Sequence, residues 1–303
     1  MVKSRVSKRE RRVARLGILV LLVATAPARG DNVWEKFSGA NAFAHVQNVV
    51  EMGPRPAGSD ALEKSRGYIR SELEKSGWRV TSQTFTDKTP RGAMTFVNLV
   101  ATFGEHPAPS FLLCSHYDTK TFDTVRFVGA NDGGSSTGLL IEMGHALASD
   151  PALAAKVELV FFDGEEAFEA FTATDGLYGS RHFAEELRAS GTTKQFHGGM
   201  LFDMVGNKSL DITLPPNSPP ELTRAIFAAA DALKLRDHFT YFQSDVTDDH
   251  TPLNAAGIPV IDLIDFDYPP WHTPEDTLDK ISAQSLEIVG RVALYALARL
   301  ELK

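Results

Sequence analysis

Five short, continuous apolar segments constrain the fold of this 303-residue chain most strongly. They are TFVNLVATF (95–103), SFLLCSHYD (110–118), VELVFFD (157–163), GMLFDMV (199–205) and IPVIDLI (258–264). Such runs are typical of strands that are covered on both faces. Helix patterns lie before, between and after them, at Ala40–Met52, Asp60–Ser76, Ser136–Ser149, Tyr178–Ser190, Pro220–Leu233 and Ala283–Leu302. This alternation predicts an α/β fold with a central, mostly parallel mixed β-sheet and helices on both faces.

The first 28 residues differ from the rest of the chain. A basic segment reaches Arg15, an apolar run spans Leu16–Val23, and small residues follow at Ala26 and Ala28. This order is typical of a secretory signal peptide, and the apolar run is shorter than the roughly 20 residues of a membrane span. We therefore expect 1–28 to be a cleaved signal peptide, with a retained anchor as the alternative, and the protein to be exported, either periplasmic or secreted. Residues 32–303 contain no internal repeat or linker and are expected to form one domain.

Charge and cysteine content limit the possible partners. Residues 1–29 carry eight Lys or Arg and one Glu, so their removal changes the formal charge from −8 to −15. Nucleic acids and anionic lipids bind basic surfaces, so we expect neither nucleic acid nor, after cleavage, a membrane as a partner. Cationic peptide or protein N-termini suit an acidic surface. Cys114 is the single cysteine, which excludes an intramolecular disulfide. We expect a monomer.

Polar residues stand where the predicted strands end. His116 and Asp118 close the second apolar segment, Asp163 closes the third, and Asp203 lies near the end of the fourth, while Asp132 precedes a predicted helix. In open α/β sheets, ligands bind outside the carboxyl ends of the strands. These residues are therefore candidates for one shared site. Each also has a structural explanation, as a turn former, a hydrogen-bonded buried histidine or a cap.

The third segment runs directly into two adjacent glutamates, Glu165 and Glu166. Neighbouring carboxylates at the end of a buried strand repel each other and lose hydration unless a cation or a proton compensates. A solvated acidic loop is the alternative. Asp, Glu and His side chains are suitable zinc ligands, and a catalytic zinc usually has three protein ligands and one open position. A zinc site would explain the acids, with Asp118 orienting the imidazole of His116.

The order of these motifs resembles the zinc-dependent aminopeptidase superfamily, which also contains the animal-type glutaminyl-peptide cyclotransferases. The matching segments are HYD (116–118), ND (131–132), DGEE (163–166), LFDMVG (201–206) and WHTPEDTLD (271–279). Two further segments, LYGSRH (177–182) and DDHTPLNAAGIPV (248–260), are similar to the cyclotransferase branch in particular. The resemblance implies a zinc-aminopeptidase-like α/β fold over most of the chain after residue 31.

The resemblance also implies roles for individual residues. It implies one Zn²⁺ held by Asp132, Glu166 and His272, with Glu165 as the general acid/base. Asp203 and Asp248 match an acid pair that hydrogen-bonds near the substrate in that family.

The implied reaction closes the N-terminal glutamine of a peptide or protein into pyroglutamate and releases ammonia. Four aromatic residues are expected to form the substrate pocket: Trp271, Phe168, Phe171 and Tyr268.

Three positions depart from the family pattern. Phe171 stands where the family has Trp, Asp262 stands where it has His, and the cysteine pair of some animal members has no counterpart beside Cys114. The lost disulfide concerns stability more than chemistry. An acid in place of an imidazole changes the charge and the direction of hydrogen bonding near the metal.

Two other functions fit the same residues. An exported two-zinc aminopeptidase would use His116, Asp132, Glu166, Asp203 and His272 as ligands, with Asp132 bridging the two ions and Glu165 activating water. A non-catalytic binding module would keep the fold without turnover. The LYGSRH and DDH segments favour the cyclotransferase over the aminopeptidase, and the intact ligand set with Glu165 argues against the binding module.

Overall fold

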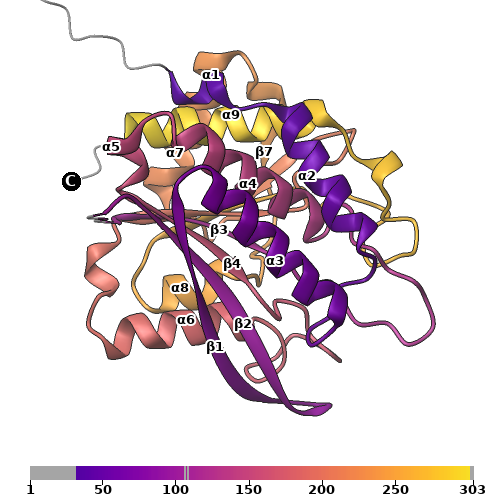
Figure 1. Ribbon diagram of the computed structural model, residues 1–303. Helices are drawn as coiled ribbons and strands as arrows, with labels where there is room; N and C mark the ends of the chain where they lie inside the picture. Colours follow the sequence, from indigo (N-terminus) through magenta and orange to yellow (C-terminus); the bar gives the residue numbers. More distant parts are fainter. Residues whose placement is uncertain (1–31, 106, 108, 301–303) are drawn as a thin grey trace, which may run out of the picture.

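A computed structural model describes residues 32–105, 107 and 109–300, which form a single α/β domain (Figure 1). The strands are β1 (Trp78–Thr89), β2 (Gly92–Phe103), β3 (Phe111–His116), β4 (Val157–Phe162), β5 (Gly198–Asp203), β6 (Ile212–Leu214), β7 (Phe239–Tyr241) and β8 (Val260–Ile264). The helices are α1 (Val33–Lys36), α2 (Gly39–Glu51), α3 (Asp60–Lys75), α4 (Gly134–Leu147), α5 (Pro151–Ala154), α6 (Tyr178–Ala189), α7 (Pro220–Leu233), α8 (His250–Ala255) and α9 (Ala283–Arg299). Short 3-10 helices are η1 (Thr193–Gln195), η2 (Arg236–His238) and η3 (Leu278–Lys280).

The described strands form one eight-stranded sheet in the order β1-β2-β4-β3-β5-β8-β6-β7. Its centre, from β4 through β3 and β5 to β8, is parallel. The β1–β2 hairpin joins antiparallel to β4, and β6 pairs antiparallel with β8. The predicted mixed α/β sheet, parallel in its centre, is therefore confirmed.

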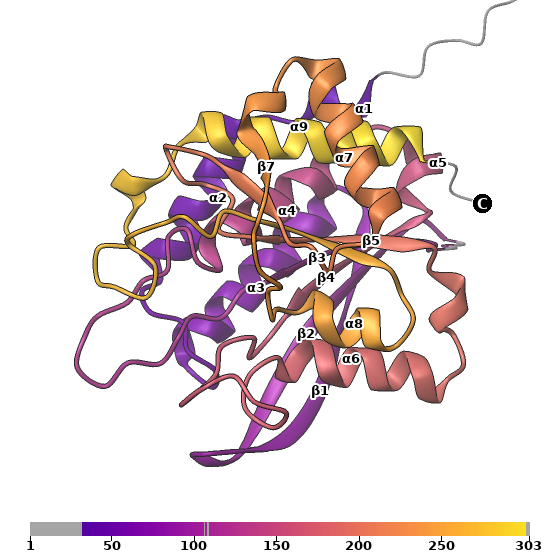
Figure 2. The same cartoon turned by 180° about the vertical axis from the view of Figure 1, so that it is seen from behind.

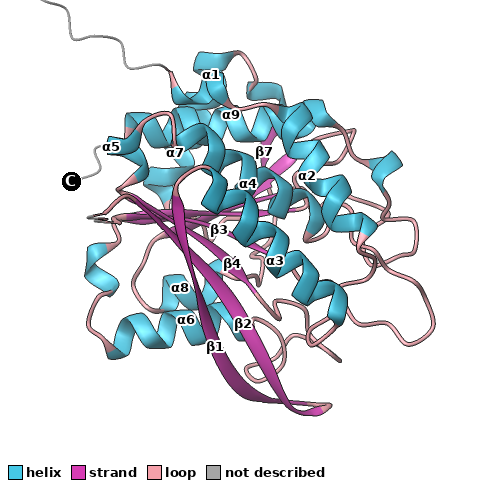
Figure 3. Ribbon diagram, viewed as in Figure 1, coloured by secondary structure: helices cyan, strands magenta, loops and turns pink. Residues whose placement is uncertain are grey.

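Helices cover both faces of the sheet (Figures 1 and 2). Helices α2, α3, α4, α7 and α9 pack on one face in the larger apolar core, and α6 and α8 pack on the other. Side chains of a central strand alternate between the two cores: Leu113 of β3 joins the larger one, whereas Leu112 and Cys114 join the smaller one. Burial on both faces explains why the central strands are continuous apolar runs in the sequence. Figure 3 shows this three-layer arrangement by element type.

The predicted helices all form, with ends that agree or differ by at most three residues. Serine side chains cap three of them: Ser38 accepts the backbone N–H of Asn41, Ser59 that of Leu62, and Ser282 that of Ser285. The sequence did not indicate β1, β6, β7 or α8. Only Trp78 and Val80 of β1 are buried, and the rest of the strand alternates between exposed and half-buried positions, so β1 carries no apolar run.

The predicted signal peptide lies outside the described residues. Among the helices of the described part, none has the length and apolar character needed to cross a membrane.

Candidate active site and metal centre

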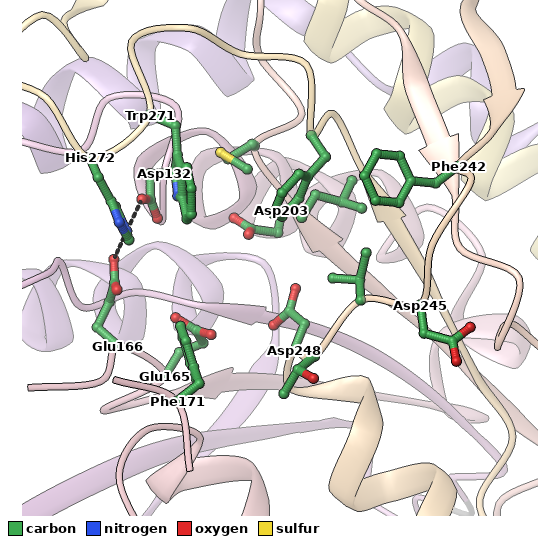
Figure 4. A pocket seen from close by; sticks show the side chains of 15 residues that line it. Asp132, Glu165, Glu166, Phe171, Asp203, Phe242, Asp245, Asp248, Trp271 and His272 are labelled. Atoms are coloured by element: carbon green, nitrogen blue, oxygen red, sulfur yellow. Dashed lines mark hydrogen bonds and ion pairs between the residues drawn. The ribbon is translucent and has the colours of Figure 1, made fainter. Parts of the chain in front are cut away.

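The carboxyl ends of the parallel strands meet beside a pocket with a cavity volume of about 190 Å³ (Figure 4). His116 is the last residue of β3, Asp203 is the last of β5, and Asp163 directly follows β4. Six carboxylates line the cavity together with His272: Asp132, Glu165, Glu166, Asp203, Asp245 and Asp248. The sheet thus brings the acids together at the edge where the strand order predicted them.

Asp132, Glu166 and His272 converge on one point of this pocket. Nε2 of His272 lies 3.3 Å from Oδ2 of Asp132 and 3.2 Å from Oε1 of Glu166 (Figure 4). One ligand atom from each residue lies within 4.8 Å of the other two. Oδ2 of Asp132 is buried and has no hydrogen-bond partner. Two carboxylates and an imidazole with an orphaned oxygen between them fit a three-ligand zinc site.

His272 is held in a strained but well-packed conformation. Its backbone φ is +57°, in the left-handed region that non-glycine residues seldom occupy. Its ring stacks on Trp271 with centroids 4.1 Å apart, and Phe127 meets it edge-on at 5.9 Å. Burial disfavours the imidazolium, but the nearby carboxylates of Asp132 and Glu166 outweigh this effect and raise the pKa of His272 to about 9. The two carboxylates thus favour positive charge at this point.

Asp276 places the loop that carries Asp132. Its carboxylate accepts the backbone N–H groups of Asn131 at 2.8 Å and of Asp132 at 3.1 Å, and Tyr268 donates its hydroxyl to the same carboxylate at 2.7 Å. Gly133 then turns the chain with φ +74°. A Cβ at this glycine would lie 2.5 Å from the Asp118 carbonyl oxygen, so the turn requires glycine.

Asp118 places the paired glutamates. Its Oδ1 accepts the backbone N–H of Glu165 at 3.2 Å, and its Oδ2 accepts that of Glu166 at 3.4 Å. Oδ1 also lies 3.5 Å from Nδ1 of His116. The sequence predicted that Asp118 orients His116. The structure adds that the same carboxylate fixes the DGEE turn.

His116 lies behind the pocket, between three carboxylates. Its Nε2 is 3.2 Å from Oδ1 of Asp203 and 3.4 Å from Oδ1 of Asp132. Burial opposes its charging, yet hydrogen bonds to Asp118, Asp132 and Asp203 raise the pKa of His116 well above its ordinary value. His116, Asp132 and Asp203 also converge closely enough to bind a metal ion, so the second ligand set of the aminopeptidase alternative is assembled as well.

Glu165 lines the pocket beside the metal ligands without belonging to either ligand set. Its side chain is buried. Burial raises the pKa of Glu165 well above its ordinary value, and the charges of Glu166 and Asp248 raise it further. A buried carboxyl that binds its proton unusually tightly is suited to proton transfer near neutral pH.

Asp248 faces Asp203 across the pocket (Figure 4). Burial raises the pKa of Asp248 well above its ordinary value, and Asp262 and Asp203 contribute. Oδ1 of Asp203 lies 3.2 Å from Nε2 of His116, while Oδ2 of Asp248 is buried without a hydrogen-bond partner in the protein. Asp262, the departure from the family pattern, lies 3.5 Å from Nδ1 of His250.

Two of the four aromatic residues expected in the pocket line it. Phe171 and Trp271 do so, each with 39% of its surface exposed. Tyr268 is instead buried against Asp276, because its hydroxyl holds that carboxylate. Phe168 packs near Tyr178 and under the guanidinium of Arg91. The expectation that Phe168 and Tyr268 form pocket walls is therefore corrected.

Sequence reasoning missed other residues that support the site. Lys120 places Nζ 3.4 Å from Oε2 of Glu166 and 2.8 Å from the Ala167 carbonyl oxygen. Arg55 is fully buried and donates to the carbonyl oxygens of Val128 at 2.8 Å and Gly129 at 3.1 Å, ahead of the Asp132 turn. In the sequence, the segment that carries Arg55, GPRPAGS (53–59), is typical of an ordinary loop. A charged residue between two prolines was the only signal.

Comparison with known proteins identifies relatives of this chain by sequence and by structure. Peptidase family M28 matches residues 98–297. A glutaminyl-peptide cyclotransferase-like protein of Bos taurus is 32% identical, over 85% of this chain and 74% of that protein. The crystal structure of an Acidobacteriales bacterium glutaminyl cyclase is 36% identical, with a TM-score of 0.82 over 90% of this chain and 97% of that one. A Zn-dependent exopeptidase from Parabacteroides distasonis is 25% identical, with a TM-score of 0.81 over 88% and 99%.

The family model covers well over half of the chain, and its ends enclose the strands and loops that carry the ligand set. The glutaminyl cyclase structure and the exopeptidase structure both share the fold of this chain, as the order of motifs in the sequence predicted. This chain belongs to peptidase family M28, in the group that includes the glutaminyl-peptide cyclotransferases.

Proposed function

We propose that the chain is a zinc-dependent glutaminyl-peptide cyclotransferase, which converts the N-terminal glutamine of peptides or proteins to pyroglutamate and releases ammonia. One observation carries the proposal: Glu165, Asp203 and Asp248 line the same small cavity as the converging ligands Asp132, Glu166 and His272. The names of the relatives point to the same reaction.

The size of the cavity suits the proposed substrate. Pockets for drug-sized ligands are usually about 300–1,000 Å³, whereas this one is about 190 Å³. A single side chain folded back on its own amino group fits such a space better than an extended peptide. Phe171 and Trp271 form apolar walls at its mouth. Because the nucleophile and the electrophile belong to one residue, orienting that residue is most of what the walls must do.

The chain's own residues move the protons. A zinc ion held by Asp132, Glu166 and His272 would supply Lewis-acid polarisation of the side-chain carbonyl. Glu165 accepts the proton that the α-amine loses as the new C–N bond forms. It then delivers that proton to the departing amide nitrogen, which leaves as ammonia. Asp118 holds Glu165 in place through the backbone, and Asp203 and Asp248 are positioned to accept hydrogen bonds from the substrate.

A two-zinc aminopeptidase is the second candidate, since His116, Asp132 and Asp203 also converge. We propose one zinc at the catalytic centre, with Asp203 acting as a hydrogen-bond partner of His116. Ammonia release from a glutamine-initiated peptide, measured beside hydrolysis of a leucine anilide, tests this assignment. Rapid ammonia release with negligible anilide turnover supports the cyclase, and the reverse result overturns it.

We further propose that the mature chain acts after export, on cationic peptide N-termini. The basic-then-apolar order of residues 1–28 and the acidic charge of the remainder support this. N-terminal sequencing of protein recovered outside the cytoplasm tests it, with a start shortly after Ala28 as the expected result.

A further inference from the structure

A further group of side chains that could hold a metal ion lies on the face of the sheet covered by α2, α3 and α4, apart from the active-site pocket. The α2–α4 cluster consists of His45 on α2 and of Glu142 and His145 on α4. Oε2 of Glu142 is 3.4 Å from Nδ1 of His145 and 3.9 Å from Nε2 of His45. Glu142 and His145 are three residues apart on α4 and therefore share one helix face.

In each histidine, the ring nitrogen that does not face Glu142 already has a hydrogen-bond partner. Nδ1 of His45 lies 2.7 Å from the hydroxyl of Tyr68, and Nε2 of His145 lies 3.1 Å from the carbonyl oxygen of Glu72. A carbonyl only accepts, so Nε2 of His145 carries the hydrogen and the neutral ring directs the lone pair of Nδ1 towards Glu142. Ligating histidines typically donate their second ring N–H in this way.

Only one of the two carboxylate oxygens of Glu142 has hydrogen-bond partners. Its Oε1 accepts from the backbone N–H of Ser38 at 3.2 Å and lies 3.4 Å from Nδ2 of Asn41. Its Oε2 has no hydrogen-bond partner, although the residue is only 2% exposed. An unpaired buried carboxylate oxygen is costly unless a positive charge compensates it. Two imidazole nitrogens face this one oxygen.

We propose that the α2–α4 cluster binds a divalent transition-metal ion, zinc in particular, through Nε2 of His45, Oε2 of Glu142 and Nδ1 of His145. Zinc bound at about 2.0–2.1 Å by tetrahedral ligands separates those ligands by roughly 3.4 Å, close to the spacings found here. Imidazole with carboxylate is a donor set that suits zinc, copper and nickel. The side chain of His145 is 27% exposed, which leaves a path for the ion and for water as a further ligand.

The bound ion would link α2 to α4. It would also link them indirectly to α3, because Tyr68 and Glu72 of α3 contact the two histidines. Anything that binds the folded chain and not the unfolded one stabilises it by mass action. The site is therefore structural, and it does not depend on the proposed reaction.

The test compares the metal content of wild type, Glu142→Gln and Glu287→Gln, each equilibrated with zinc buffered at micromolar free concentration. Glu287 is the matched control because its carboxylate caps the start of α2 through the backbone N–H of Gly39 and lies outside the cluster. Glu142→Gln should hold one zinc fewer than wild type, while Glu287→Gln should match wild type. The difference counts this site alone, whatever number of ions the catalytic centre holds.

A second variant covers the case in which Glu142→Gln folds poorly. His145 is partly exposed, so His145→Ala should fold, release ammonia at the wild-type rate and bind one zinc fewer. Added zinc should raise the unfolding temperature of wild type above that of this variant. Equal zinc content in wild type and in His145→Ala would overturn the proposal and leave a proton shared between His145 and Glu142 in its place.

Discussion

The carboxylate of Asp118 accepts the backbone N–H of Glu165, with 3.2 Å between Oδ1 and the nitrogen. Glu165, the proposed proton carrier, is thereby fixed through its backbone, which leaves its side chain free to face the pocket. The other oxygen of Asp118 holds Glu166 in the same way at 3.4 Å. One carboxylate thus sets the positions of the proposed metal ligand and of the proposed general acid/base.

Replacing Asp118 should therefore impair both functions. Asp118→Ala removes both acceptors, and we expect zinc affinity to fall by about tenfold to a hundredfold, the usual effect of losing a residue that orients ligands. Asp118→Asn keeps one acceptor oxygen and should lie between this variant and wild type. Zinc competition with a chromophoric chelator measures the effect. Unchanged affinity in Asp118→Ala would contradict the role assigned to this carboxylate.

The paired glutamates should respond differently to the same substitution. Glu165→Gln should keep its zinc and lose roughly a hundredfold or more in kcat, the scale of a lost general acid/base. Glu166→Gln should release zinc more readily, because it removes one of three ligands. Metal content and ammonia release, measured on both variants, separate the two roles. Equal zinc loss in both would show that the division of labour is wrong.

Substitutions of the aromatic residues Tyr268 and Phe171 should affect different properties of the enzyme. Tyr268→Phe removes the hydroxyl that holds Asp276, so we expect weaker zinc binding and a stability loss of about 1–3 kcal/mol, with KM little changed. Phe171→Ala removes a pocket wall and should raise KM for a glutamine-initiated peptide without changing zinc content. Steady-state kinetics at saturating zinc distinguish the two. A raised KM in Tyr268→Phe would instead indicate that Tyr268 contacts the substrate, as the sequence led us to expect.

Glu158 on β4 should make stability depend on pH at a place remote from the ligands. Burial raises its pKa from 4.5 to about 7. The folded chain therefore holds this proton more tightly than the unfolded chain between pH 4.5 and 7, and the free energy of unfolding falls as pH rises through that interval. Glu158→Gln removes the cost of burying this charge. At pH values above the folded-state pKa, the free energy of unfolding of the variant should therefore exceed that of wild type by up to roughly 3 kcal/mol.

Urea unfolding of both proteins at pH values on either side of that interval measures the effect. The exposed Glu185→Gln is the matched control and should show no pH-dependent difference from wild type. If Glu158→Gln differed from wild type by the same amount at low and high pH, burial of the charge would not be the cause.

The sequence predicted the central strands because they leave a local pattern, whereas the proposed ligand set came from the resemblance to the zinc aminopeptidases; the structure brings its three side chains together. Strands buried on two faces are continuous apolar runs, and parallel strands bring their carboxyl ends together, so His116 and Asp203 could be placed beside each other without coordinates. Strand β1 could not be predicted in this way, since its half-exposed residues give no apolar run.

Side-chain direction could not be read from the sequence either. An aromatic residue close to His272 in the chain suggested a pocket wall, but Tyr268 turns inward to Asp276. His45 and Glu142 are 97 positions apart and meet only because α2 packs on α4. Contacts of this kind depend on tertiary packing, which a pattern in one segment does not contain.

Asp203→Asn tests the central claim most directly. The variant should be compared with wild type on one preparation for zinc content, ammonia release from a glutamine-initiated peptide and hydrolysis of a leucine anilide. In the cyclase, Asp203 is a hydrogen-bond partner of His116 at 3.2 Å and no metal ligand, so the zinc content should equal that of wild type while ammonia release falls strongly. The account would be contradicted if the variant lost one zinc and also lost anilide hydrolysis, or if its ammonia release were nearly normal.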